Sequence, residues 1–308
     1  MNVLIIKINS TGDVVRTTTL LRRLEGNVTW VSAPHNIAVL SRKDANLRCL
    51  GWEERGRARD RSYDLVINLE DQIDAARFVG EMRYKQLFGA YLNGGQNVSY
   101  TDDSRQWFDL SLVSVYGRAE ADRLKLQNRR TYQDLIFEGL GFCFAGEKYV
   151  LPQPAVTDLV GDVALAPAAG PVWPAKGWAY YGQLKLELEA QGLRVNVLPK
   201  RPSLLEHLSD VRNHRCLVSG DSLPMHLALG TGTRCVTLFN CTSPWEIHAY
   251  GLQTKIVSPL LEQFFYWRSF DDRAIRAIGV EEVFAAVLAR LKGDQSSNRE
   301  VRSEPGRE

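Results

Sequence analysis

The sequence predicts an α/β protein that consists of two open domains, each with a parallel sheet covered by helices. Short apolar runs of strand length alternate with segments of helical periodicity along most of the chain. This alternation occurs twice, on either side of the proline-punctuated stretch 149–156, which is typical of a linker. The length of 308 residues is also sufficient for two domains of ordinary size.

In the first half, strands are predicted at residues 3–8 (VLIIKI), 28–33 (VTWVSA) and 64–70 (DLVINLE), each followed by a helical pattern. The first helix is predicted over residues 13–24 (DVVRTTTLLRRL). Residues 84–130 are turn-rich and contain aromatic side chains without clear periodicity, which favours a mobile binding loop or an insertion. The alternation of strands and helices in the first half therefore predicts a parallel sheet. The pattern predicts no regular structure for the segment that follows it.

The second half repeats the alternation after the linker. Strands are predicted at 161–168 (GDVALAPA), 194–199 (RVNVLP), 215–221 (RCLVSGD) and 234–239 (RCVTLF), and helices at 178–191, 203–213 and 222–229. The predicted domains are residues 1–155 and 156–292. The tail, residues 293–308, is polar and charged with almost nothing to bury, so we expect it to be disordered.

Composition and charge exclude several classes of protein. A formal net charge of +2 gives no electrostatic basis for a dedicated nucleic-acid binder. The five cysteines are widely spaced and form no Cys/His ligand pattern, so neither a disulfide framework nor a zinc site is indicated. The start MNVLIIKINSTGD lacks a basic region before its short apolar run, and no window is long enough to span a membrane. We expect a cytoplasmic protein.

The first candidate site follows the first predicted strand. Open α/β sheets bind ligands at the carboxyl ends of their strands, where this chain has NSTGD. Gly12 permits a tight turn and Asp13 begins the next helix. Two interpretations of Asp13 stay open at this point: a charge that favours the helix N-terminus, or a general base that faces a ligand.

The second candidate site lies in the second half. Lys176 follows a Gly/Pro-rich turn and stands between Trp173 and Trp178, where it either faces solvent or reaches a phosphate as a point charge. Further along, Ser222 is a good N-cap, and the free backbone N–H groups of the helix that it begins attract anions. The alternative is that Ser222 only starts the helix and that Asp221 is a solvated turn residue.

Three stretches together resemble a known family. VLIIKINSTGDVVRTTTLLRRL, PAAGPVWPAKGW and SGDSLPMHLALGTGTRCVTLFNCTSPWEIHAYG are similar, in order, spacing and content, to the signatures of glycosyltransferase family 9, the lipopolysaccharide heptosyltransferase family. The resemblance implies a GT-B fold, in which two Rossmann-like domains face one another across a cleft. It further implies that residues 1–155 bind the acceptor, that residues 156–292 bind the nucleotide sugar, and that transfer inverts the anomeric centre.

The resemblance also assigns roles to residues. Asp13 matches the catalytic aspartate that deprotonates the acceptor hydroxyl, and Lys176 matches the lysine that neutralises the donor diphosphate. The residues that match the loop and helix start around the nucleotide are Asp221, Ser222, Met225 and His226. For His226 the alternative of a helix histidine packed against the sheet stays open.

The substrates and location follow from the same resemblance. It implies a nucleotide-sugar donor, ADP-heptose in the heptosyltransferases, and a saccharide or glycolipid acceptor, with no metal ion and no cofactor beyond the donor. Peripheral contact with the cytoplasmic face of the inner membrane is compatible with the basic segments RRLEGN and KLQNRR, although such segments are more often solvated faces. No nucleic-acid partner is expected.

The chain departs from the family pattern at three places. Leu223 replaces a glycine, the stretch Asn240–Pro244 replaces a glycine-proline-threonine turn, and Ala168 and Ala169 stand where some members have hydroxyl residues. Two other functions stay open, and the departures at Leu223 and Ala168 bear on the second of them. One is a GT-B nucleotide-sugar epimerase or hydrolase, for which Glu70 and Asp71 would supply acid and base. The other is a sugar-nucleotide binding protein without catalytic activity.

Overall fold

The structure, a computed structural model, describes residues 1–41, 46–106, 113–168, 170 and 172–300. The chain divides into two units. The first comprises Met1–Gln153 together with the short segment Trp245–His248, and the second comprises Pro154–Pro244 and the chain from Ala249 onward. The division falls close to the boundary expected at residue 155, and the first unit additionally includes a segment from far along the sequence.

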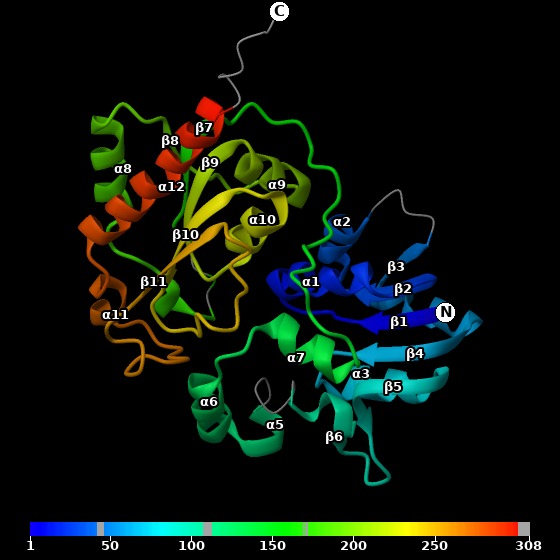
Figure 1. Ribbon diagram of the computed structural model, residues 1–308. Helices are drawn as coiled ribbons and strands as arrows, with labels where there is room; N and C mark the ends of the chain where they lie inside the picture. The colour runs from blue at the N-terminus through cyan, green and yellow to red at the C-terminus, as the bar shows by residue number, and fades with distance from the viewer. Residues whose placement is uncertain (42–45, 107–112, 169, 171, 301–308) are drawn as a thin grey trace, which may run out of the picture. The chain divides into compact units, whose positions relative to one another are not determined.

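The first unit is built on one sheet with the strand order β3-β2-β1-β4-β5-β6. Its strands are β1 (Asn2–Ile6), β2 (Asn27–Ser32), β3 (Leu47–Gly51), β4 (Ser62–Asn68), β5 (Arg83–Leu92) and β6 (Val98–Tyr100). Strands β1 to β5 pair in parallel, and β6 pairs antiparallel with β5. The blue and cyan strands of Figure 1 show this sheet. The three strands predicted from the apolar runs of the first half are confirmed.

Both faces of this sheet are covered, which explains why its strands are apolar almost throughout. On one face, Val3 and Ile5 pack with side chains of α1 (Thr11–Thr17) and α7 (Tyr132–Gly139). On the other face, Leu4 and Ile6 pack with side chains of α3 (Ile73–Gly80). All four strand residues are completely buried. Shorter elements complete this part of the unit: η2 (Pro34–Asn36), α2 (Ile37–Leu40), η3 (Trp52–Asp60) and η4 (Asp102–Ser104).

The helix predicted over residues 13–24 is shorter than expected. Helix α1 ends at Thr17, and a 3-10 helix, η1 (Thr18–Arg22), continues the chain. The hydroxyl groups of three consecutive threonines donate to carbonyl oxygens of the preceding turn, Thr17 to Asp13, Thr18 to Val15 and Thr19 to Arg16. Such bonds compete with the regular helical pattern and tighten or bend a helix.

Residues 84–130 contain regular structure that the sequence pattern did not reveal. Strand β5 and strand β6 form a hairpin across a turn in which the backbone N–H of Asn93 donates to the carbonyl of Asn97. Helices α5 (Val113–Tyr116) and α6 (Arg118–Gln127) follow. The sequence pattern did not identify this hairpin, whose connection is the turn-rich NGGQN; a binding role for residues 84–130 stays a prediction. Residues 107–112 lie outside the described part of the chain.

The second unit has a parallel sheet with the order β11-β10-β9-β7-β8. Its strands are β7 (Gly161–Ala166), β8 (Val195–Val197), β9 (His214–Gly220), β10 (Arg234–Phe239) and β11 (Gln253–Val257). Its helices are η5 (Pro174–Lys176), α8 (Tyr181–Ala190), α9 (Leu204–Arg212), α10 (Leu223–Thr231), α11 (Asp272–Arg276) and α12 (Val280–Glu300). Side chains of α8 and α12 share a core with one face of the sheet, and α9 and α10 contact β9. The predicted strands and helices of this half are confirmed.

The C-terminal helix, α12, continues to Glu300. The disorder expected for residues 293–308 stays a prediction. Residues 301–308 lie outside the described part. Within residues 1–300, as far as they are described, no helix combines the length and the apolar character needed to cross a bilayer.

Gly89 provides a test of how closely β4 and β5 approach. Its φ is +112°, and an added Cβ would lie 1.9 Å from the backbone oxygen of Asn68. We expect Gly89→Ala to lower the free energy of unfolding by at least about 3 kcal/mol, because backbone on both strands must move. Gly80→Ala is the control, since a Cβ at Gly80 meets nothing within 4 Å; it should change stability by no more than about 1 kcal/mol. Urea denaturation of the two variants measures both values, and equal stabilities would contradict the close approach.

Candidate functional site

Each sheet has a topological switch point, where the strand order reverses. One candidate site lies at the switch point of the first sheet and the other at that of the second. In the first unit the order of strands reverses between β1 and β4, so the segments after these strands diverge: the loop after β1 leads into α1, which carries Asp13, and the loop after β4 carries Glu70. In the second unit it reverses between β7 and β9, whose following loops carry Lys176 and Asp221. Ligands of doubly wound sheets bind beyond the carboxyl ends of the strands at such points.

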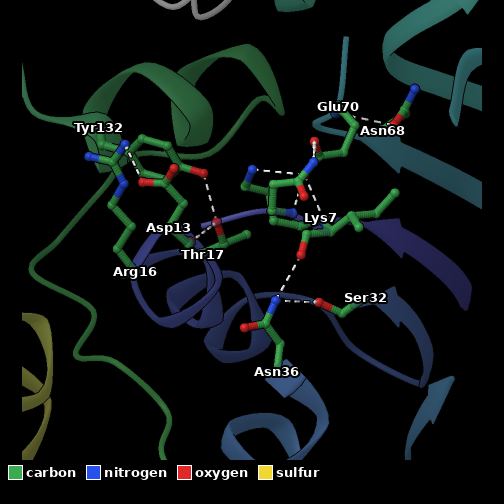
Figure 2. A network of polar contacts seen from close by, with 11 residues as sticks. Lys7, Asp13, Arg16, Thr17, Ser32, Asn36, Asn68, Glu70 and Tyr132 are labelled. Atoms are coloured by element: carbon green, nitrogen blue, oxygen red, sulfur yellow. Dashed lines mark hydrogen bonds and ion pairs between the residues drawn. The ribbon is translucent and has the colours of Figure 1, made fainter. Parts of the chain in front are cut away.

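The buried carboxylate of Glu70 organises the loop after β1. Glu70 is 4% exposed, and its Oε1 accepts hydrogen bonds from Lys7 Nζ (2.8 Å), Ile8 N (2.6 Å) and Asn9 N (3.0 Å). Its Oε2 accepts a further bond from Asn9 Nδ2 at 3.2 Å. Figure 2 shows Glu70 and Lys7 at the centre of this network. Because the charges are paired and the backbone donors are satisfied, burial of this ion pair is tolerated.

Asn36 holds the same loop from the other side. Its Nδ2 donates to the carbonyl of Ile8 at 2.7 Å and to Ser32 Oγ at 3.2 Å, and its Oδ1 accepts from Thr11 Oγ1 at 2.7 Å. Between these anchors Ser10 has a φ of +60°, a conformation that non-glycine residues rarely adopt. The anchors on both sides maintain this strained conformation, which sets the start of α1 and thus the position of Asp13.

Asp13 lies in the first turn of α1 and forms an ion pair within its own helix. Its Oδ1 lies 2.8 Å from Nη2 of Arg16, whose guanidinium carbon lies 3.8 Å from the ring centre of Tyr132. The hydroxyl groups of Tyr132 and Thr17 are 2.7 Å apart (Figure 2). Burial opposes the charge on Arg16, but Asp13 and other neighbours raise the pKa of Arg16 above its ordinary value. A permanent positive charge therefore stands beside the Asp13 carboxylate.

The segment Trp245–His248 packs against this region. The carbonyl oxygen of Glu246 accepts from the backbone N–H of Tyr132 at 3.0 Å, and Arg129 stacks 3.7 Å above the ring of Trp245. The ring of His248 meets that of Phe144 edge to face at 5.1 Å. The charge of Glu246 also contributes to the raised pKa of Arg16. This short segment is thus part of the surroundings of the Asp13–Arg16 pair.

In the second unit, Lys176 and Asp221 are brought together although 45 residues separate them in the sequence. Lys176 Nζ donates to the carbonyl oxygen of Asp221 at 2.8 Å and to its Oδ2 at 3.2 Å, with both side chains largely buried. The ammonium also lies 5.8 Å from the ring centre of Trp173, on which Arg268 stacks at 4.7 Å. Lys176 is therefore not simply solvent-facing.

Close backbone contact sets this geometry. A Cβ on Gly220 would lie 2.9 Å from the carbonyl oxygen of Lys176, so glycine permits the end of β9 to approach the Lys176 loop. Asn240, which follows β10, donates through Nδ2 to the carbonyl of Gly177 at 2.6 Å. The loops after β7, β9 and β10 are thereby connected.

The other predicted residues lie at the start of α10. Ser222 is the N-cap by backbone conformation, but its side chain makes no capping hydrogen bond and instead donates to the carbonyl of Gly220 at 3.3 Å. Met225 and His226 are buried on the helix, which agrees with the interpretation of His226 as a packed helix residue and leaves its ligand role untested. Leu223 occupies the first helical position and is partly exposed. Ala168 is exposed, and Ala169 lies outside the described residues.

Several polar residues at these sites were not identified from the sequence. Arg16, Tyr132 and Lys255 belong to this group, as does the anchoring role of Glu70. Lysine within an apolar strand, as in VLIIKI and QTKIV, is the signal that was available, because a buried charge requires a partner. Among the residues that the structure describes, no group of three or more His, Cys, Asp or Glu side chains is placed to hold a metal ion.

Comparison with known proteins connects this geometry to a family. A family model described as glycosyltransferase family 9 (heptosyltransferase) matches residues 172–264, which include Lys176, Asp221 and α10. No curated protein sequence matches the chain significantly.

Solved structures are similar over nearly the whole chain. The glycosyl transferase family 9 protein from Veillonella parvula DSM 2008 has a TM-score of 0.66 at 14% identity, covering 95% of this chain and 97% of its own. E. coli heptosyltransferase WaaC with ADP has a TM-score of 0.63 at 16% identity, covering 94% and 100%. E. coli ADP-heptose lps heptosyltransferase II has a TM-score of 0.63 at 15% identity, covering 96% and 100%. These likenesses show the GT-B fold. Within this fold, residues 172–264 are similar to the glycosyltransferase family 9 (heptosyltransferase) domain.

Proposed function

We propose that the protein is an inverting glycosyltransferase that moves heptose from ADP-heptose to a saccharide acceptor in the synthesis of lipopolysaccharide or another surface glycan. One observation carries the proposal: the polar residues of both units lie at the switch points of their sheets, with a carboxylate in one unit and a lysine beside a helix N-terminus in the other. These are the groups that inverting transfer requires.

On the acceptor side, Asp13 is the proposed base. The acceptor hydroxyl transfers its proton to the Asp13 carboxylate while its oxygen forms a bond to the anomeric carbon, and the bond from that carbon to the diphosphate breaks. Positioned proton transfer of this kind accelerates a reaction by about 10²–10⁴-fold. Arg16 fixes the carboxylate through the 2.8 Å ion pair, and its stacking on Tyr132 fixes Arg16.

On the donor side, Lys176 and the first turn of α10 are the proposed site of the diphosphate. The ammonium and the free N–H groups stabilise the charge that develops on the leaving group, so no metal ion is needed for this step. In the described structure the ammonium contacts Asp221, and a diphosphate would share or replace this contact. We propose that Ser222, Met225 and His226 border the nucleotide. Leu223 brings a side chain where close approach favours glycine, so its orientation affects how the donor binds.

The alternative of an epimerase or hydrolase is disfavoured by the environment of Glu70. This carboxylate is buried and accepts hydrogen bonds from Lys7, Ile8 and Asn9. Its role is therefore to hold the loop after β1. An acid or base that reacts with substrate needs access to it, which Glu70 lacks. Burial raises the pKa of Asp71, and the charge of Glu70 adds to this effect.

Location and acceptor complete the proposal. The proposed setting is the cytoplasm, with peripheral contact at the cytoplasmic face of the inner membrane, where a glycolipid acceptor would be presented. The charge balance of +2 supports no nucleic-acid partner.

Asp13→Asn tests the proposed base. We expect kcat to fall by about 10²–10⁴-fold with unchanged affinity for ADP, because the amide cannot accept the proton yet keeps the shape of the carboxylate. Transfer of labelled sugar from ADP-heptose to a panel of core saccharides measures kcat, and calorimetry measures affinity. Asp74→Asn is the matched control, since Asp74 forms an exposed pair with Arg77 on α3. Near-normal turnover of Asp13→Asn would remove Asp13 from the mechanism.

Lys176→Ala tests the proposed diphosphate site. We expect ADP binding to weaken by about 1.5–3 kcal/mol, the range for hydrogen bonds to charged groups. The loss has two causes, because the variant removes the cation and leaves Asp221 facing the phosphates. Lys185→Ala removes a partly exposed lysine that pairs with Glu189 on α8 and should bind ADP normally. If calorimetry shows that Lys176→Ala binds ADP with the affinity of the wild type, the diphosphate binds elsewhere.

Glu70→Gln separates anchoring from acid–base catalysis. Removing one partner of a buried ion pair leaves Lys7 uncompensated, and we expect the free energy of unfolding to fall by about 3–5 kcal/mol. Asp74→Asn, which breaks an exposed pair, should change it by less than about 1 kcal/mol. Urea denaturation gives both values. A variant that keeps full stability but loses turnover would instead favour a direct catalytic role for Glu70.

A further inference from the structure

A row of side chains crosses the sheet of the second unit near its carboxyl end and ends in a lysine. The strand registers pair Ala166 with Ser219, Ser219 with Thr237, and Thr237 with Lys255, so these four residues lie on the same face of the sheet. Lys255 is a charged residue on β11, an edge strand, and it is only partly exposed. Neither the family match nor the proposed mechanism gives it a role.

The ammonium of Lys255 holds the turn that follows β10. Its Nζ donates to the carbonyl oxygen of Pro244 at 2.5 Å. At the other end of the same turn, Asn240 Nδ2 donates to the carbonyl oxygen of Gly177, the residue after Lys176. The carbonyl oxygen of Cys241 accepts from the backbone N–H of Tyr266 at 2.7 Å. The turn is therefore fixed from β11 on one side and from the Lys176 loop on the other.

This turn carries buried polar atoms that suggest a function beyond packing. The atoms are Asn240 Oδ1, Thr242 Oγ1 and Ser243 Oγ, and none of them has a hydrogen-bond partner among the described residues. All three residues are at least 96% buried. Unpaired buried polar groups cost about 1–3 kcal/mol each, so their presence together points to a bound partner, water or ligand, at the turn.

Asp221, which follows β9 and contacts Lys176, and the Cys235 thiol on β10 both favour the charged form of Lys255. Burial lowers the pKa of Lys255 to about 8, against the opposing effect of the Asp221 carboxylate. Burial raises the pKa of Cys235 to about 12, so this thiol is neutral at physiological pH. While Lys255 is protonated, its positive charge adds to that of Lys176 and offsets the carboxylate of Asp221.

We propose that Lys255 is a further positioning residue of the donor site, which fixes the Asn240–Pro244 turn and, together with Lys176, offsets the negative charge of the Asp221 carboxylate. This inference rests on the proposed function. If Lys176 were the only cation, the Asp221 carboxylate would cancel its positive charge and leave none to attract a diphosphate. The charge of Lys255 restores a net positive charge. Lys255 thus acts on the ligand through Asp221 and the turn.

The titration of Lys255 makes the inference measurable. A bound diphosphate favours the protonated lysine, so ADP affinity should be full below pH 7.5 and fall as pH rises through the pKa of the free protein, about 8. The free energy of unfolding of the protein without ligand changes with pH in the opposite direction to the ADP affinity. Because the folded pKa lies below the unfolded value, the unfolded chain binds more protons between pH 8 and about 10.4, and stability rises with pH in that window.

The test compares the full chain with Lys255→Met and Lys255→Arg, and with Lys185→Met as the control for loss of a partly exposed lysine on α8. Calorimetry with ADP is performed from pH 7 to 9.5, in buffers of different ionisation enthalpy to detect proton uptake, and inorganic pyrophosphate is tested at pH 7 alone. For Lys255→Met we expect affinity on the order of tenfold lower at pH 7, no pH dependence and no proton uptake. Arginine stays charged, so Lys255→Arg should bind without pH dependence and exceed the wild type at pH 9.5.

The outcomes separate this inference from the proposed function. If the wild type binds ADP with an affinity that is independent of pH and equal to that of Lys255→Met, the inference is wrong and the proposed function stands. If neither ADP nor pyrophosphate binds the wild type, both are wrong. Should Lys255→Met fail to fold, Lys255→Arg decides, because a pH profile identical to that of the wild type contradicts the inference. Lys185→Met should match the wild type in every measurement.

Discussion

The carboxylate of Glu70 is the interaction on which the arrangement of the first unit most depends. It follows β4 in the sequence but accepts hydrogen bonds from the backbone N–H groups of the loop after β1, a strand that pairs with β4. These bonds fix the path of that loop. Lys7 balances its charge inside the protein, and Asn68 accepts from the backbone N–H of Glu70 at 3.2 Å. The direction in which α1 begins, and with it the position of Asp13, follows from these bonds. An apolar residue at 70 would leave two backbone donors unpaired.

Both candidate sites contain backbone held in a rare conformation. Ser10 precedes α1 with a φ of +60°, and Tyr266, with a φ of +50°, donates its N–H to Cys241 and packs edge to face on Trp173. Such conformations cost about 1–3 kcal/mol each and persist only where surrounding contacts impose them. At Ser10 the contacts are those of Glu70 and Asn36 with the flanking residues. At Tyr266 they are the Cys241 carbonyl and the ring of Trp173, whose other neighbours include Lys176 and Arg268.

The sequence predicted much of the sheet framework and only part of the polar framework. Buried parallel strands are apolar throughout, so runs such as VLIIKI and RCVTLF could be located within about two residues. The helix after β1 was predicted too long, because the back-bonding of Thr17, Thr18 and Thr19 depends on side-chain geometry that a periodicity does not contain. The β5–β6 hairpin was missed because its glycine-rich turn is typical of a loop. Lys176 and Asp221 were identified singly. That they touch, and that Lys255 holds the turn after β10, depends on strand order, which only the folded chain reveals.

The path of the chain through Trp245–His248 has a consequence for protein engineering. Two-domain enzymes are often recombined by joining the first half of one parent to the second half of another, and Gln153/Pro154 would be the natural junction here. In such a hybrid, however, the partner of Arg129, Tyr132 and Phe144 would come from the wrong parent, because the segment that they contact is encoded after β10. A functional exchange would therefore need three crossover points, so that these four residues travel with the first unit. For the same reason, a fragment that stops at Gln153 would expose aromatic surface beside Arg16 that the intact chain covers.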